Sequence, residues 1–173
     1  MDTGDGPWAV RALAALAACD PITVVVGAQA DEVAALLPAG VRVERNDDFD
    51  LGMGSSLRRG LLGLSARSDE DDVDAVVVML VDLPDVGAAV VRRIVATATG
   101  PIRPALVRAA LVRAAYGGRP GHPVLLGRDH WPGVLATATG DRGARGYLVE
   151  HGATMVECGD LATGTDVDRP GMS

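Results

Sequence analysis

The sequence predicts an α/β fold in which helices cover both faces of a mostly parallel β-sheet. Runs of Val, Ile and Leu alternate at short intervals with amphipathic segments of helical period. The run at 75–81 is apolar at every position, which is typical of a parallel strand that is buried on both faces. Strands and helices that alternate along a chain usually build a parallel sheet with helices on its two sides.

Periodicity, together with Gly and Pro at the ends of segments, locates the elements of the first half. Pro7 suits the first turn of a helix, and Asp31 and Glu32 favour the positive N-terminal end of another helix, which Pro38 ends. In chain order we expect a helix at 7–19, a strand at 22–26, a helix at 30–37, a strand at 41–44, a helix at 55–66, a strand at 75–81 and a helix at 86–98.

The second half is less regular and contains a short tandem duplication. Strands are expected near 105–115, 122–126 and 154–157, and helices near 129–136 and 143–150. The pentapeptide ALVRA at 105–109 is repeated at once at 110–114, which either lengthens a strand or pushes out a bulge or loop. No linker rich in Ser, Pro or Gly divides the chain, so we expect a single domain over 1–173.

Composition narrows the classes of protein that this chain can represent. With 48% hydrophobic and 23% charged residues, it is typical of a globular protein. A net charge of -7 argues against a surface that binds nucleic acid, but it leaves room for a pocket that binds one nucleotide. Cys19 and Cys158 lie far apart and form no metal-binding pair. No signal peptide and no membrane-spanning stretch is evident, so we expect a cytoplasmic protein with no membrane partner.

The first candidate site follows the apolar run at 75–81. Ligands of open parallel sheets collect beyond the carboxyl ends of the strands, and Asp82 lies at such an end. A carboxylate in this position can bind Mg²⁺, which takes one or two carboxylates together with substrate phosphates. The alternative is that Asp82 only turns the chain and that Asp85 caps the following helix.

A second candidate site is the loop Gly52-Met-Gly-Ser55-Ser56, which leads into a helix. Glycines, hydroxyl groups and a helix N-terminus together can bind an anion or a ribose, and Gly54, Ser55 and Ser56 are the candidate residues. The alternative is a glycine-rich turn in which Ser55 or Ser56 is merely the N-cap.

Three later segments carry weaker signals. A histidine at the start of a strand can contact a substrate phosphate, although structural histidines are more common. The GDRGAR segment at 140–145 offers a helix cap and two arginines with the fork geometry that suits phosphate. Two alternating carboxylates near the C-terminus are either further metal ligands or part of a solvated tail. The residues concerned are His122, Asp141, Arg142, Arg145, Asp166 and Asp168.

Taken together and in this order, these segments resemble the MobA-like nucleotidyltransferases, especially the molybdenum cofactor cytidylyltransferases. The resemblance covers nearly the whole chain, and the stretch from GHP to GDRGAR is its specific part. The matching stretches are VVVGAQADEV at 24–33, Asn46 with GMGSSLRRGL at 52–61, VVVMLVDLPDV at 76–86, YGGRPGHPVLLGRDHW at 116–131, GDRGAR at 140–145 and TDVDRP at 165–170.

The resemblance implies a Rossmann-like three-layer α/β sandwich and a Mg²⁺-dependent reaction. Such enzymes transfer CMP or GMP from an NTP to a phosphorylated pterin, the molybdenum cofactor, and release pyrophosphate. CTP is slightly preferred here, other phosphorylated acceptors remain open, and maturation factors of molybdenum hydroxylases are possible partners. By this resemblance Asp82 is catalytic and binds the metal, and Asp166 and Asp168 complete the metal site. The 54–56 loop reads base and ribose, and His122 with the 140–145 loop lies on the acceptor side.

One departure from the family pattern concerns the N-terminus. Family members open with a strand, a loop of the form LAAGxxxRxG and a lysine, whereas this chain matches from their first helix onward and contains no lysine. The first strand of the family would lie between the strands at 22–26 and 75–81. We therefore expect an N-terminally incomplete domain that pairs these strands directly, borrows a strand or folds poorly. The alternative function is an inactive or non-catalytic nucleotide- or cofactor-binding accessory protein for molybdoenzyme maturation.

Overall fold

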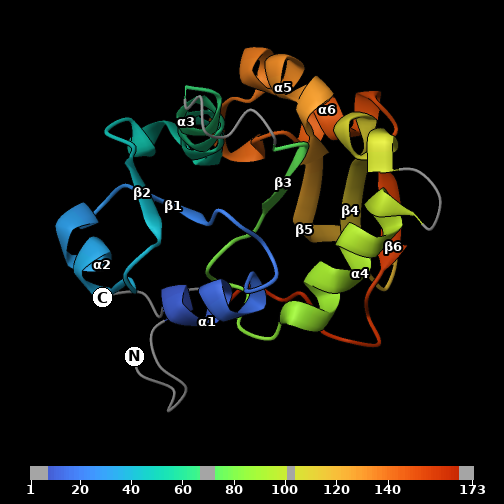
Figure 1. The fold of residues 1–173 in the computed structure, drawn as a ribbon, viewed down its shortest axis with the longest axis horizontal. Coiled ribbons are helices and arrows are strands. Elements are labelled where there is room, and N and C mark those ends of the chain that lie inside the picture. The colour runs from blue at the N-terminus through green and yellow to red at the C-terminus, as the bar shows by residue number, and fades with distance from the viewer. Residues whose placement is uncertain (1–7, 67–72, 101–103, 168–173) are drawn as a thin grey trace.

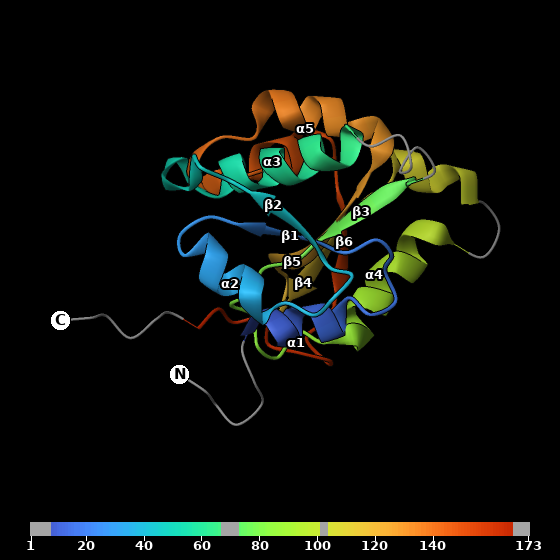
Figure 2. The same cartoon turned by 60° about the vertical axis from the view of Figure 1, so that its left-hand side comes forward.

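The computed structural model describes residues 8–66, 73–100 and 104–167, which form three layers (Figure 1). Figure 2 shows helices α3 and α5 on one side of the strands and helices α1, α2 and α4 on the other. The elements are α1 (Trp8–Ala15), β1 (Thr23–Val26), α2 (Ala30–Leu36), β2 (Arg42–Arg45), α3 (Met53–Ser65), β3 (Ala75–Val78), α4 (Ala88–Thr99), β4 (Leu111–Tyr116), β5 (Arg119–Gly127), α5 (Trp131–Thr137), α6 (Arg145–Glu150) and β6 (Thr154–Glu157), with short 3₁₀ helices η1 (Phe49–Leu51), η3 (Pro104–Ala109), η4 (Arg128–His130) and η5 (Gly140–Arg142).

The strands form two sheets, and the predicted α/β fold is confirmed. β1 pairs with β2 in parallel, and a second sheet has the order β3-β5-β4-β6. In this second sheet β4 and β6 are parallel, whereas β5 runs antiparallel to both of its neighbours. The cause is a tight turn at Gly117 and Gly118, whose φ angles of 58° and 76° suit a two-residue hairpin. The sheet is therefore mixed rather than mostly parallel in the second half of the chain.

A cavity of about 580 Å³ lies between the two sheets. Within the described ranges β1 and β3 do not pair with each other, so each is an edge strand on the side that faces its counterpart. Residues of both strands line the cavity, together with α1 and α3. Every residue of β3 is only half-buried, although all four are apolar. Of the three outcomes expected from the sequence, direct pairing of the two strands is thus not observed.

The cores on the two faces of the larger sheet follow from the alternation of side chains along β4 and β5. Leu111, Val124 and Leu126 pack with α3, α5 and α6. Val112 and Leu125, one position along each strand, pack with α4 on the opposite face. This period of two is what a sheet covered on both sides requires.

The two copies of the ALVRA pentapeptide adopt different structures. The first copy belongs to η3, a 3₁₀ helix, and the second copy lies almost entirely in β4. The expectation of a strand from residue 105 is therefore wrong for 105–109. Arg108 of the first copy pairs with Asp74 at 3.1 Å and with Asp129 at 3.5 Å.

No helix in the described part of the chain is long and apolar enough to cross a membrane.

Candidate functional site

Asp82 follows β3 by four residues and has an unusual environment for a carboxylate. Its Oδ1 is buried and has no hydrogen-bond partner among the residues that the structure describes. A buried acceptor without a partner costs about 1–3 kcal/mol, so native proteins rarely leave one unless a ligand or water completes it. Val81, the residue before it, lines the cavity between the sheets. The position predicted from the sequence thus carries a buried carboxylate oxygen without a partner, beside a cavity.

The C-terminal segment is held against the same loop. The N–H of Val167 donates to the carbonyl oxygen of Asp82 at 3.0 Å. Asp85 accepts hydrogen bonds from Thr163, at 2.5 Å from its N–H and 2.7 Å from its hydroxyl. Burial raises the pKa of Asp85, but these hydrogen bonds outweigh it and the net pKa is lowered. The expectation that Asp85 caps a helix is wrong, because α4 begins at Ala88 with Gly87 as its N-cap.

Asp166 directly precedes Val167 in the chain. The hydrogen bond between the N–H of Val167 and the carbonyl oxygen of Asp82 therefore places the Asp166 backbone close to the Asp82 loop. Asp168, the other predicted metal ligand, lies outside the described residues. Among the residues that are described, no three His, Cys, Asp or Glu side chains come together as a metal cluster. A cation here would thus be bound by one or two carboxylates and by oxygen atoms of a substrate, which is the usual arrangement for Mg²⁺.

The glycines of the predicted 52–56 loop serve close packing. Gly52 has φ 94°, and a Cβ at this position would lie 2.6 Å from Oδ1 of Asp141. A Cβ on Gly54 would lie 2.8 Å from the backbone of Thr139. The start of α3 is thus pressed against the 139–141 segment, so the structure brings together two segments that the sequence singled out separately. Asp141 does not cap α6, whose N-cap is Ala144.

The two serines of this loop are oriented by Asn46, whose role is visible only in the structure. The Nδ2 of Asn46 donates to the Oγ of Ser55 at 2.8 Å and to the Oγ of Ser56 at 3.0 Å. Ser55 donates in turn to the carbonyl oxygen of Gly52 at 2.8 Å. Asn46 is only 5% exposed, so it is a buried anchor for both hydroxyl groups. Neither serine is an N-cap, since α3 has Gly52 in that position.

The cavity has a basic end. Ser56, His122, Arg142 and Arg145, all predicted from the sequence as substrate-binding residues, line it. A further lining residue, Arg113 of β4, was missed. The sequence does not distinguish Arg113 as a site residue, because Arg108 occupies the same position in the first copy of the pentapeptide.

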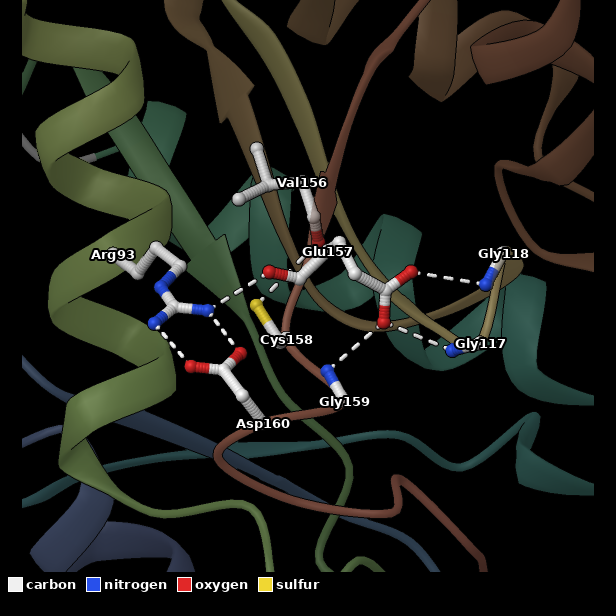
Figure 3. A network of polar contacts seen from close by, with 8 residues as sticks. All are labelled: Arg93, Gly117, Gly118, Val156, Glu157, Cys158, Gly159 and Asp160. Carbon is white, nitrogen blue, oxygen red and sulfur yellow. Dashed lines mark hydrogen bonds and ion pairs between the residues drawn. The ribbon is translucent and has the colours of Figure 1, made fainter.

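Glu157 holds the β4–β5 hairpin, which carries Arg113 and His122 (Figure 3). Its carboxylate accepts hydrogen bonds from the backbone N–H groups of Gly117, Gly118 and Gly159, each at 2.9 Å. Hydrogen bonds from Gly118, Gly117 and Gly159 lower the pKa of Glu157. The turn between β4 and β5 is thereby tied to the end of β6.

Arg93 of α4 ties the same strand end to the helical layer (Figure 3). Its guanidinium donates to both carboxylate oxygens of Asp160, at 2.5 and 2.8 Å, and to the carbonyl oxygen of Glu157 at 2.9 Å. Such two-pronged pairs fix geometry more firmly than single contacts. The site's hairpin therefore rests on a rigid base.

Comparison with known proteins places the chain in a family. Residues 1–155 match the MobA-like NTP transferase domain, and the chain belongs to this family. Nicotine blue oxidoreductase of Paenarthrobacter nicotinovorans is 32% identical over 158 residues, which cover 87% of this chain and 72% of that protein.

Solved structures with the same fold include two mycobacterial proteins. The Rv0371c homologue from Mycobacterium sp. strain JC1 has a TM-score of 0.73 at 27% identity, over 95% of this chain and 78% of its own. Rv0371c of Mycobacterium tuberculosis, in complex with manganese, has a TM-score of 0.63 at 27% identity, over 89% and 76%. A nucleotidyl transferase from Methanothermobacter thermautotroptrophicus has a TM-score of 0.65 at 29% identity, over 87% and 69%. The family and the fold inferred from the sequence are thus confirmed.

Proposed function

We propose that this protein is a nucleotidyltransferase that moves CMP or GMP from an NTP to the phosphate of a pterin, the molybdenum cofactor, and releases pyrophosphate. The observation that carries the proposal is the buried, unpartnered Oδ1 of Asp82 beside a cavity with a basic end. Membership of the MobA-like family supports the reaction class. Maturation factors of molybdenum hydroxylases are the corresponding protein partners.

The residues present fit a divalent cation, which we take to be Mg²⁺. An unsatisfied carboxylate oxygen is the donor that such hard cations prefer, and Asp82, Asp166 and Asp168 would bind the ion. The manganese complex of Rv0371c supports a divalent metal in a protein of this fold. When bound, the cation neutralises the charge that builds up on the transferred phosphoryl group.

The other site residues position the two substrates. Asn46 fixes the hydroxyl groups of Ser55 and Ser56, which then offer hydrogen bonds to the base or ribose. Arg142 and Arg145, which line the same cavity, supply cations for phosphate oxygens. Catalysis of this kind depends mainly on in-line positioning and on neutralising charge. Hydroxyl groups that position the nucleotide and arginines that neutralise phosphate charge are therefore the types of residue that the reaction needs.

The test replaces Asp82 with Ala and measures nucleotide binding with and without Mg²⁺ or Mn²⁺. We expect the metal-dependent part of CTP and GTP binding to be lost, while the protein still unfolds cooperatively. Asp74→Ala is the matched control, because Asp74 lies at the opposite end of β3, is exposed and pairs with Arg108. Equal metal-dependent affinity in wild type and Asp82→Ala would overturn the assignment of Asp82.

The second candidate function is a nucleotide- or cofactor-binding accessory protein without turnover. It is favoured by the lack of any lysine in the chain and by the open cavity between β1 and β3. Pyrophosphate release with CTP or GTP, Mg²⁺ and molybdopterin distinguishes the two functions. Binding without release supports the accessory role, whereas sustained release supports the enzyme.

A further inference from the structure

The basic end of the cavity combines side chains from three parts of the fold. Arg113 comes from β4, His122 comes from the adjacent β5, and two arginines flank the connection between η5 and α6. Arg113 lies two residues beyond Leu111 and His122 lies two residues before Val124, so both continue the rows of apolar side chains that face α3, α5 and α6. The four residues are Arg113, His122, Arg142 and Arg145.

Arg113 is the most enclosed of the three arginines. It is half-buried, and its Nε donates to the carbonyl oxygen of Gly121 at 3.0 Å, which fixes the side chain along the hairpin. Burial lowers the pKa of Arg113, and the charge of Arg145 lowers it further. Burial and the charge of Arg113 also lower the pKa of His122 to about 4, so the imidazole is neutral at pH 7. Arg113 therefore lies close enough to Arg145 for the two cations to repel each other, and close enough to His122 to keep its ring neutral.

Within the described ranges, no carboxylate forms an ion pair with Arg113, Arg142 or Arg145. This contrasts with four arginines elsewhere in the described part of the chain, whose charge is compensated by a carboxylate of the protein. Those pairs are Arg45 with Asp31, Arg59 with Glu44, Arg93 with Asp160, and Arg108 with Asp74 and Asp129. In a protein with a net charge of -7, three neighbouring arginines without an acidic partner indicate that the compensating anion comes from a ligand.

We infer that this end of the cavity is a binding site for a phosphate dianion and that Arg113 is its specificity-determining anchor. The guanidinium fork of Arg113 matches two phosphate oxygens, and its fixed Nε leaves both Nη groups for that purpose. Arg142 and Arg145 close the site from the exposed side, and neutral His122 contributes a ring N–H. The source of the phosphate rests on the proposed function: it is either the phosphomonoester of the acceptor or a phosphate of the nucleotide.

The test titrates metal-free protein with phenyl phosphate and with inorganic pyrophosphate in a calorimeter. We expect Arg113→Met to weaken phosphate binding at least about tenfold, because a charge-assisted hydrogen bond is lost, and Arg113→Lys to weaken it less. Arg108→Met is the matched control, since Arg108 occupies the same position in the duplicated pentapeptide but is ion-paired with Asp74 and Asp129, and we expect no change. Equal binding by wild type and Arg113→Met would overturn the inference.

A second measurement keeps the test independent of folding effects. In wild-type protein, the NMR resonance of the Arg113 Nε–H should shift on addition of phenyl phosphate, and absence of both shift and binding heat would also overturn the inference. Displacement of phenyl phosphate by CTP with Mg²⁺ assigns the site to the nucleotide, and simultaneous binding assigns it to the acceptor. Asp82→Ala should still bind phenyl phosphate, so failure of the metal assignment and failure of the phosphate site give different results.

Discussion

A strand that pairs with both β1 and β3, in the apolar part of the cavity away from its basic end, should stabilise this protein strongly. The perturbation is a fusion ahead of residue 1 that carries a short strand of Val, Leu and Ala and a glycine-containing turn. The strand would precede α1, which itself precedes β1, so the three would form a right-handed β-α-β unit with a parallel pair. The facing edges of β1 and β3 offer the backbone groups that such a strand needs.

The expected gain can be estimated from the lengths of the two edges. Thr23–Val26 and Ala75–Val78 have four residues each, so an inserted strand would form about eight backbone hydrogen bonds, each of net value ~0.5–1.5 kcal/mol. Burial of about five aliphatic side chains adds ~10 kcal/mol, and ordering about five residues costs ~8 kcal/mol. The net gain is on the order of 6–14 kcal/mol, which corresponds to a rise in Tm of at least about 10 °C.

Calorimetry and hydrogen exchange measure this gain. The fusion should raise Tm and slow exchange of the β1 and β3 amides, whereas a control fusion with Lys and Pro in the strand should do neither. An equal rise in Tm for both fusions would refute the reasoning, because the effect would then not depend on strand pairing. A monomeric unfused protein that melts cooperatively above about 60 °C would also refute the reasoning. The unpaired edges of β1 and β3 could not then lower the stability of the protein by much.

Two further predictions concern buried polar groups. Asn46→Ala removes three hydrogen bonds and should lower the free energy of unfolding by about 2–3 kcal/mol in urea denaturation, while exposed Asp48→Ala should change it by less than about 0.5 kcal/mol. For His122, burial and the charge of Arg113 lower the pKa from 6.5 to about 4, so the unfolded chain takes up a proton first as pH falls. Wild type should therefore lose about 3 kcal/mol more of its unfolding free energy between pH 7 and pH 4 than His122→Gln does, and parallel pH profiles would contradict this.

Local pattern was sufficient to predict most elements because their apolar residues have a clear period. The strand at 154–157 agrees with the observed Thr154–Glu157, and the helix expected at 30–37 is observed at Ala30–Leu36. The antiparallel direction of β5 was missed, although the Gly117-Gly118 pair is a recognised hairpin signal. The two copies of ALVRA could not be distinguished by any local rule, since identical residues form a 3₁₀ helix and a strand.

The candidate site likewise contains residues that the sequence predicted and residues that only the structure reveals. The sequence identified Asp82, Ser56, His122, Arg142 and Arg145 because strand ends and glycine-rich loops mark where polar groups collect. The sequence alone could not show that Glu157 supports the hairpin, because it lies 40 residues from Gly117 along the chain.

The roles of Arg113 and of the two serines also depend on tertiary contacts that the sequence does not show. Asn46 contacts Ser55 across nine positions, and its importance depends on burial at 5% exposure. The role of Arg113 depends on neighbours from a different strand and a distant loop. Such relations are set by packing and are not encoded in the spacing of residue types.

The duplicated pentapeptide has five residues, an odd number, and this parity has a consequence for the sheet. Five extra residues within β4 would exchange its two faces, so that Arg113 would point towards α4 and Val112 and Ala114 towards the cavity. The extra residues are instead accommodated in η3, where a longer connection costs little chain entropy. The number of copies at this point thus alters the length of a connection and leaves the inside and outside of the sheet unchanged.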